Sequence, residues 1–216
     1  MYSKKPCIHY ESLQHLTSDF TLDIDPNLGY CSLRIFHEVA RRNVNTSEII
    51  CDIPDPSKEQ VQKLFTEGVQ AWEDSETCKQ LRPILLARKD FLNGKINKIV
   101  AFANGSFSFD LLDKSYHRTS FQHALILSLR DIFAQVNETP GVKCLAQDPA
   151  YTDADREVLH NSDITVIADP KGFLEVDEST IMTSFAPNVP VKSIISDIAR
   201  PAVIIWNTIR PEDPES

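Results

Sequence analysis

The 216-residue sequence has no run of about 20 apolar residues, which is the length that a membrane-spanning helix needs. Its first ten residues, MYSKKPCIHY, also lack the apolar core of a secretory signal peptide. These two absences predict a protein of the cytoplasm or nucleus that does not bind membranes.

Cysteine is scarce and scattered. The cysteines are odd in number, stand far apart and form no CxxC pair, which argues against a zinc cage and against a disulfide framework. The sequence also contains neither an HExxH motif nor a cluster of His and Cys, so it predicts no metal site. We therefore expect five free thiols, namely Cys7, Cys31, Cys51, Cys78 and Cys144.

Basic residues are outnumbered, since 22 Lys and Arg face 31 Asp and Glu and give a formal net charge of -9. Non-specific binding to nucleic acid relies on clustered Lys and Arg that release counterions from phosphates. Nucleic acid is therefore not an expected partner. With 42% hydrophobic and 25% charged residues, the composition is that of an ordinary globular protein.

Residues 1–94 carry mainly helical patterns. The first is at residues 33–40, where the apolar positions Leu33, Phe36, Val39 and Ala40 have helical spacing. A capping-box pattern at residues 57–60 then precedes an apolar stripe, which predicts an amphipathic helix docked on a core. A third helix is expected from Ser75 toward Lys89, broken or bent at Pro83. The sequence thus predicts a helical extension packed on the core and ending at the Asn93-Gly94 turn.

From Ile96 onward, short apolar runs alternate with helical patterns, which is typical of βαβ units and a parallel sheet. Five strands are expected, at residues 99–103, 142–146, 164–168, 180–185 and 202–206. Helices are expected at residues 119–136, after a Thr152 cap, and from Asn188 to Ala199. Asn188 is expected to cap the last helix, which would pack on the sheet through Val191, Ile194, Ile195 and Ile198. Residues 95–210 are therefore predicted to form an α/β, Rossmann-like, mostly parallel sheet with flanking helices, followed by an acidic flexible tail at 211–216.

Ligands of open parallel sheets bind beyond the carboxyl ends of the strands, so we searched the segments that follow each predicted strand. Gly105 and Ser106 follow the first strand, and a residue without a Cβ lets the backbone approach a ligand closely. The glycine-rich run of dinucleotide-binding loops is absent, however. A plain turn glycine is the alternative interpretation.

Asp148 and Tyr151 follow the second predicted strand. There an acidic side chain could accept hydrogen bonds from ribose hydroxyls. We predict that Asp148 faces a cleft formed with the loop at Gly105 and the segment at residues 117–118. The alternative is a structural Asp-Pro turn in which Asp148 binds only nearby backbone N–H groups.

A polar segment leads into the helix predicted at residues 119–136. His117 and His123 are the candidates for acid-base catalysis, and Arg118 could hold a carboxylate or phosphate, with Gln122 beside it. Isolated histidines are more often structural. The sequence has no GxSxG elbow and no P-loop, so nucleophilic hydrolysis and nucleoside triphosphate hydrolysis lack a motif.

Five short motifs together resemble the Sensitivity to Red Light Reduced-like domain family, particularly its fungal branch. They are VAFANGS at 100–106, SFQHA at 120–124, AQDPAY at 146–151, GFLEVD at 172–177 and APNVPV at 186–191. The resemblance covers about residues 96–206. It implies a domain connected with light and circadian signalling in plants and with cytoskeletal or stress phenotypes in fungi. It also implies a shared edge lined by Gly105, Ser106, Gln122, Asp148, Pro149 and Tyr151.

Two functions from different classes follow from these observations. The first is a regulatory or interaction protein that keeps a Rossmann-like scaffold without turnover, with a small molecule or a protein as its partner. The second is an enzyme or sensor that binds an adenosine-containing cofactor, such as S-adenosylmethionine or an adenine nucleotide, without a metal. The fold alone does not choose between them.

Overall fold

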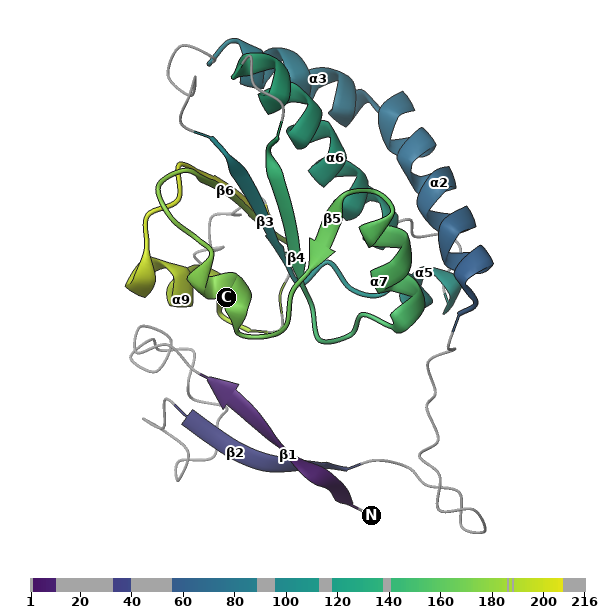
Figure 1. Cartoon of the computed structure of the whole chain (residues 1–216), viewed down its shortest axis with the longest axis vertical. Helices are drawn as coiled ribbons and strands as arrows, with labels where there is room; N and C mark the ends of the chain where they lie inside the picture. The colour runs from purple at the N-terminus through teal and green to yellow at the C-terminus, as the bar shows by residue number, and fades with distance from the viewer. Residues whose placement is uncertain are drawn as a thin grey trace, which may run out of the picture.

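A computed structural model describes residues 2–10, 33–39, 56–88, 96–112, 118–137, 141–185, 187 and 189–207 (Figure 1). Its main sheet has five parallel strands in the order β5-β4-β3-β6-β7. The strands are β3 (Lys98–Phe102), β4 (Lys143–Gln147), β5 (Ile164–Val166), β6 (Thr180–Ser184) and β7 (Val203–Ile205). This order and direction confirm the predicted α/β Rossmann-like fold.

Helices cover both faces of this sheet (Figure 1). One face carries α2 (Lys58–Asp74), α3 (Glu76–Leu86), α5 (Ser108–Leu112), α6 (Arg118–Val136) and α7 (Asp153–His160). The other face carries α8 (Lys171–Leu174) and α9 (Val191–Ile198). Because both faces are covered, the central strands are apolar almost throughout.

Alternate residues of the central strands belong to two separate cores. Ile99, Ala101 and Ile181 pack in the core under α2 and α6. Val100 and Met182, their neighbours in the chain, pack in the core under α8 and α9. This alternation follows from the two-residue period of a strand.

The helices α2 and α6 approach each other very closely. A Cβ atom on Gly68 would lie 2.1 Å from the Cβ of Ser120, so only glycine fits there. The indole Nε1 of Trp72 donates a hydrogen bond to Ser128 Oγ at 2.9 Å. The capping box predicted at Ser57 is confirmed, and α2 forms part of the same core as α6.

One expectation for the N-terminal part is wrong, and of the break or bend expected at Pro83 only the break is contradicted. Residues 33–39 form no helix but the strand β2 (Leu33–Val39), which pairs antiparallel with β1 (Tyr2–Tyr10). Helical spacing is a local signal, whereas this strand is specified by a partner more than 20 residues away in the sequence. The helix α3 also continues through Pro83 without a break, with Ala87 N donating to Pro83 O at 2.9 Å.

The start of α9 differs from the expectation as well. Pro190 occupies the N-cap position and provides no side-chain hydrogen bond, while Asn188 lies outside the described residues. Val191 and Ile195 are buried against the sheet, but Ile198 is 50% exposed and does not belong to the packed face. The short helix α8 was not expected from the sequence, because four residues are too few to show a helical period.

Several other expectations fall on residues that are not described. These are the boundary at Asn93-Gly94, the tail at 211–216, Cys31, Cys51 and the side chain of Cys7. Cys78 and Cys144 are free thiols, as expected. Among the described residues, no helix combines the length and the apolar character of a membrane span.

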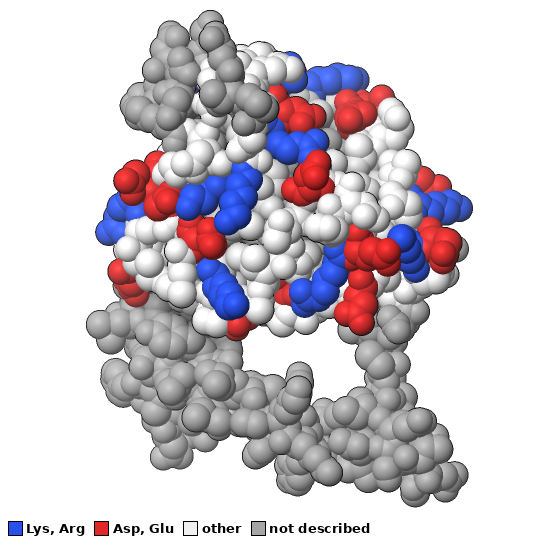
Figure 2. All heavy atoms as spheres, viewed as in Figure 1, with Lys and Arg blue, Asp and Glu red and all other residues white. Residues whose placement is uncertain are grey.

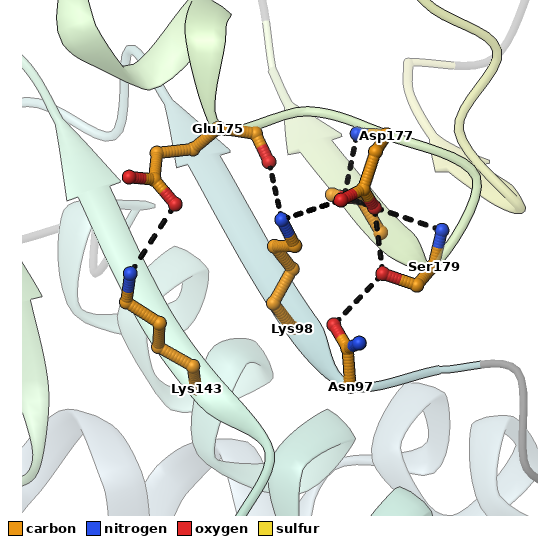
Figure 3. Close-up of polar contacts among 7 residues, drawn as sticks. Asn97, Lys98, Lys143, Glu175, Asp177 and Ser179 are labelled. Carbon is orange, nitrogen blue, oxygen red and sulfur yellow. Dashed lines mark hydrogen bonds and ion pairs between the residues drawn. The ribbon is translucent and has the colours of Figure 1, made fainter.

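A polar network closes the amino end of the sheet (Figure 3). Lys98 Nζ donates to Asp177 Oδ2 at 2.7 Å and to the backbone oxygen of Glu175 at 2.8 Å. The other oxygen of Asp177 accepts hydrogen bonds from Ser179 and from the Thr180 hydroxyl. Partial burial on its own raises the pKa of Asp177, but these donors together hold it well below its usual range.

Candidate functional site

The strand order of the main sheet reverses between β3 and β6. The chain leaves β3 toward α6 on one face and leaves β6 toward α9 on the other. The carboxyl ends of these two strands therefore border the topological switch point, which is the usual ligand position in open α/β sheets.

The loop after β3 has an unusual backbone. Ala103 has φ 57° and Gly105 has φ 76°, so two of three consecutive residues are in the left-handed region. This conformation is uncommon for a residue with a Cβ and is costly for Ala103. The strained loop turns the chain sharply at the tip of the first strand of the domain.

Four buried polar residues with unpaired atoms lie at the switch point. The atoms without a hydrogen-bond partner are Asn104 Oδ1 and Nδ2, Gln122 Oε1, Thr183 Oγ1 and Ser184 Oγ. Each of the four residues is at most 8% exposed. In the described part of the chain, these are all of the buried side-chain N and O atoms that lack a partner. We call the four residues the switch-point cluster.

The position of the cluster follows from the strand register. Thr183 and Ser184 are the last two residues of β6, and Ser184 lies opposite Phe102, two residues before Asn104. Gln122 is on the second turn of α6. Strand alternation places Thr183 on the α6 face, together with Ile181, and Ser184 on the α9 face.

The end of the neighbouring strand β4 provides a contrast. Gln147 is as buried as Gln122, but its Nε2 donates to Asp169 Oδ1 at 2.8 Å and its Oε1 accepts from Gly172 N at 2.6 Å. Leaving a buried polar atom unpaired costs about 1 to 3 kcal/mol. The shortage of partners is therefore specific to the β3 and β6 ends.

A largely apolar cavity of about 570 Å³ meets the cluster at Gln122, whereas Asn104, Thr183 and Ser184 do not line it. Gln122 belongs to both the cavity and the switch-point cluster. The exposed Arg118 donates a hydrogen bond from Nη2 to the backbone oxygen of Phe185 at 3.1 Å. This volume is typical of small-molecule sites. We call the cavity the α6 groove, and it is lined by Trp72, Thr77, Leu81, Arg118, Phe121, Gln122, Leu125, Phe185, Ile205 and Asn207.

The structure brings Asp148 and Gly105 into direct contact. Asp148 Oδ2 accepts from Gly105 N at 2.7 Å, and Asp148 Oδ1 accepts from Ala150 N at 2.8 Å. The carboxylate thereby ties the loop after β3 to the loop after β4. Ser106 is buried and bonds within its own turn, accepting from Ser108 N at 3.0 Å. A ligand-binding role for Asp148 and Ser106 stays a prediction.

Two further carboxylates bind backbone N–H groups of the same region. Asp110 accepts from Thr119 N at 3.3 Å and from Ser120 N at 3.1 Å, which caps the start of α6. Asp155 accepts from Phe107 N at 3.2 Å and from Thr152 N at 2.7 Å. Asp110 is 4% exposed and Asp155 is fully buried.

His123 and Tyr151 form a buried pair. His123 Nδ1 lies 2.7 Å from Thr119 O, and its Nε2 lies 2.8 Å from the Tyr151 hydroxyl. Since a carbonyl only accepts, Nδ1 carries the proton and Nε2 accepts from Tyr151. Burial lowers the pKa of His123 to about 4 and raises that of Tyr151 well above its usual value. Both ring nitrogens are bonded to protein groups, and a catalytic role for His123 stays a prediction.

Comparison with known proteins identifies the family of this domain. The SRR1 domain profile matches residues 61–213. The chain belongs to the SRR1 domain family. The match begins at Val61, within α2, and so includes more of the chain than residues 96–206, over which the motifs resemble the family. No curated protein and no solved structure gave a significant match. Family membership supports a regulatory or signalling-type protein and nothing more specific.

The site of this SRR1 domain is only partly the one expected from the sequence. Gln122 and Arg118 line the α6 groove, Gly105 and Asp148 bond to each other but do not line it, and His117 lies outside the described residues. Sequence reasoning missed Asn104, Thr183 and Ser184 as site residues. A polar pair at the end of a buried strand was the available signal for Thr183 and Ser184.

The face of the SRR1 domain drawn in Figure 2 carries acidic and basic side chains in alternation. The ion pairs among the described residues include Lys58 with Glu157 and Lys143 with Glu175. Across the ranges that the structure describes, no group of three or more His, Cys, Asp or Glu residues could hold a metal ion.

Proposed function

We propose that this SRR1 domain is a regulatory protein that binds a small molecule at the switch point and does not convert it. The observation that carries the proposal is the switch-point cluster, in which five buried polar atoms have no partner. A bound ligand that supplies those hydrogen bonds would remove a penalty of about 1 to 3 kcal/mol for each atom. Because such a ligand binds only the folded domain, the free energy of unfolding would rise with the ligand concentration.

Turnover is not part of the proposal, because the chemical groups near the cluster are already engaged. The carboxylates of Asp110, Asp148 and Asp155 hold backbone N–H groups, and His123 is neutral and bonded at both nitrogens. Burial also raises the pKa of Cys144 to about 11, which keeps its thiol protonated and unreactive. The free thiols Cys78 and Cys144 support our proposal that the protein works in the reducing cytoplasm or nucleus.

The second candidate function is an enzyme or sensor with an adenosine-containing cofactor such as S-adenosylmethionine. It is favoured by one contact, that of Asp148 at the tip of β4 with Gly105 at the tip of β3. A carboxylate at that position can also accept hydrogen bonds from ribose hydroxyls. Both candidates use the same switch point and differ in whether the bound molecule is changed.

The test is ligand-dependent stabilisation of the whole chain, measured against a small-molecule collection that includes S-adenosylmethionine, adenosine and nicotinamide. A ligand at 100 times its dissociation constant should raise the free energy of unfolding by about 2.7 kcal/mol. Thr183→Val should lose this stabilisation, and Thr180→Val should keep it because the Thr180 hydroxyl bonds to Asp177 at the other end of β6.

The ligand is then recovered after prolonged incubation and analysed by mass spectrometry. An unchanged ligand supports regulation without turnover. A converted ligand favours the enzyme. Equal stabilisation of the wild type and Thr183→Val by the same ligand would contradict a site at the switch-point cluster.

A further inference from the structure

The backbone N–H groups that bind phosphate in many Rossmann domains are occupied here by the protein itself. In those domains phosphate lies on the loop after the first strand and on the N-terminus of the next long helix. In this chain the corresponding groups donate to side chains. Gly105 N donates to Asp148, Phe107 N to Asp155, and Thr119 N and Ser120 N to Asp110.

These three carboxylates also make the position unfavourable for another anion. Asp110 and Asp155 are nearly or fully buried, so their charges are weakly screened by solvent. Among the ion pairs of the described residues, none involves Asp110, Asp148 or Asp155. A phosphate placed on this loop would lose the N–H donors and meet uncompensated negative charge.

The unpaired atoms themselves define the polar part of a ligand. Asn104 offers one acceptor and an NH₂ donor, Gln122 offers an acceptor, and the hydroxyl of Thr183 on the α6 face can donate or accept, whereas Ser184 is on the α9 face. None of these groups is charged. An amide side chain with both atoms free pairs well with a ring edge that carries a donor next to an acceptor, as nucleobases do.

The α6 groove defines the apolar part of a ligand. Its walls include the aromatic rings of Trp72, Phe121 and Phe185, and Gln122 joins it to the cluster. Aromatic walls favour a flat ring system, which buries a large apolar area and stacks on them.

We infer that the switch point binds a flat, uncharged heterocycle with a nucleobase-like edge and discriminates against its phosphorylated form. This inference rests on the proposed function. The phosphate-free class is set by Asp110, Asp148 and Asp155, which occupy the N–H groups of the loop after β3 and of the start of α6. The nucleobase-like edge is set by Asn104 and its unpaired neighbours.

The experiment compares adenosine, guanosine, cytidine and uridine with their 5′-monophosphates by isothermal titration calorimetry on the full chain. Trp72 fluorescence provides a second readout in a Trp206→Phe variant, since the chain has two tryptophans. We expect at least one nucleoside to bind, its monophosphate to bind at least 10-fold more weakly, and Asn104→Leu to lose binding. Circular dichroism establishes that Asn104→Leu is folded, and Asn161→Leu, at the exposed C-cap of α7, is the matched control.

Two results would overturn the inference. One is a monophosphate that binds as tightly as its nucleoside or more tightly, and the other is that no nucleoside binds the wild type. The proposed function fails separately, when Thr183→Val destabilises the ligand-free protein as strongly as Thr180→Val does. In that case Thr183 has a structural partner and the cluster is no binding site.

Discussion

At the amino end of β3 and β6, Lys98 and Thr180 bond to Asp177, whereas at the carboxyl end of the same two strands Asn104, Thr183 and Ser184 have no partner. The two ends belong to one sheet, and Thr180 at one end is as buried as Thr183 at the other, although Lys98 and Asp177 are only half-buried. Burial in the same sheet therefore does not explain why the buried hydroxyl has hydrogen-bond partners at one end and none at the other. Buried groups that lower stability are often retained where a function needs them, so the contrast supports our proposal of a site at the carboxyl end.

The largest effect should come from His123, which is fully paired. Its folded-state pKa of about 4 lies below the unfolded value of about 6.5, so between these values the unfolded chain binds a proton that the folded chain does not. The free energy of unfolding should be constant above pH 6.5 and fall by roughly 3 kcal/mol as the pH decreases toward 4. Chemical denaturation of the wild type and His123→Gln across this range measures the effect.

The free energy of unfolding of His123→Gln should lack this dependence on pH, although Asp and Glu residues still change it below pH 5. Identical slopes for the two proteins between pH 6.5 and 5 would show that His123 is not buried as a neutral group.

The second effect concerns the amino end. Asp177→Asn removes the charge that pairs with Lys98 and replaces one acceptor oxygen with a donor. We expect a loss of about 2 kcal/mol, reduced from the value of a buried pair because Asp177 is partly exposed. Urea denaturation at pH 7 measures it, with the exposed neighbour Glu178→Gln as the control. Equal midpoints for the two variants would remove the contrast between the two ends.

A smaller effect is expected at Asp148. In Asp148→Asn the new NH₂ group cannot accept a hydrogen bond, so either Gly105 N or Ala150 N loses its partner. The free energy of unfolding should decrease by about 1 kcal/mol. A decrease below 0.5 kcal/mol, as for an ordinary surface substitution, would indicate that the two backbone bonds contribute little and that Asp148 is free to bind a ligand.

The five strands of the main sheet and the helices α6, α7 and α9 were predictable because each has its own signal, whereas the short helices α5 and α8 were not predicted. An apolar run of five residues at 99–103 marks β3, a run of three at 144–146 lies in β4, and the predicted Thr152 cap, confirmed in α7, marks a helix start. The strand β2 was not predictable, because its partner β1 is distant in the sequence. Asp110 was missed for the same reason, since it caps α6 from nine residues away.

The site was less predictable than the fold. The sequence shows that Asn104, Thr183 and Ser184 are polar and adjoin strands, but it does not show whether they have partners. Thr180 and Thr183 illustrate the difficulty, since they are the same residue type on the same strand and are equally buried. Only the structure shows that one is bonded to Asp177 and the other to nothing.

The free energy of unfolding of Thr183→Val, measured beside Thr180→Val in the ligand-free protein, tests the central claim most directly. Valine keeps the shape of threonine and removes the hydroxyl. Thr180→Val should be destabilised by about 1 to 3 kcal/mol, because Asp177 loses a partner, whereas Thr183→Val should be unchanged or stabilised by up to about 1 kcal/mol. A destabilisation of Thr183→Val equal to that of Thr180→Val would contradict the claim that the switch point holds unpaired polar groups for a ligand.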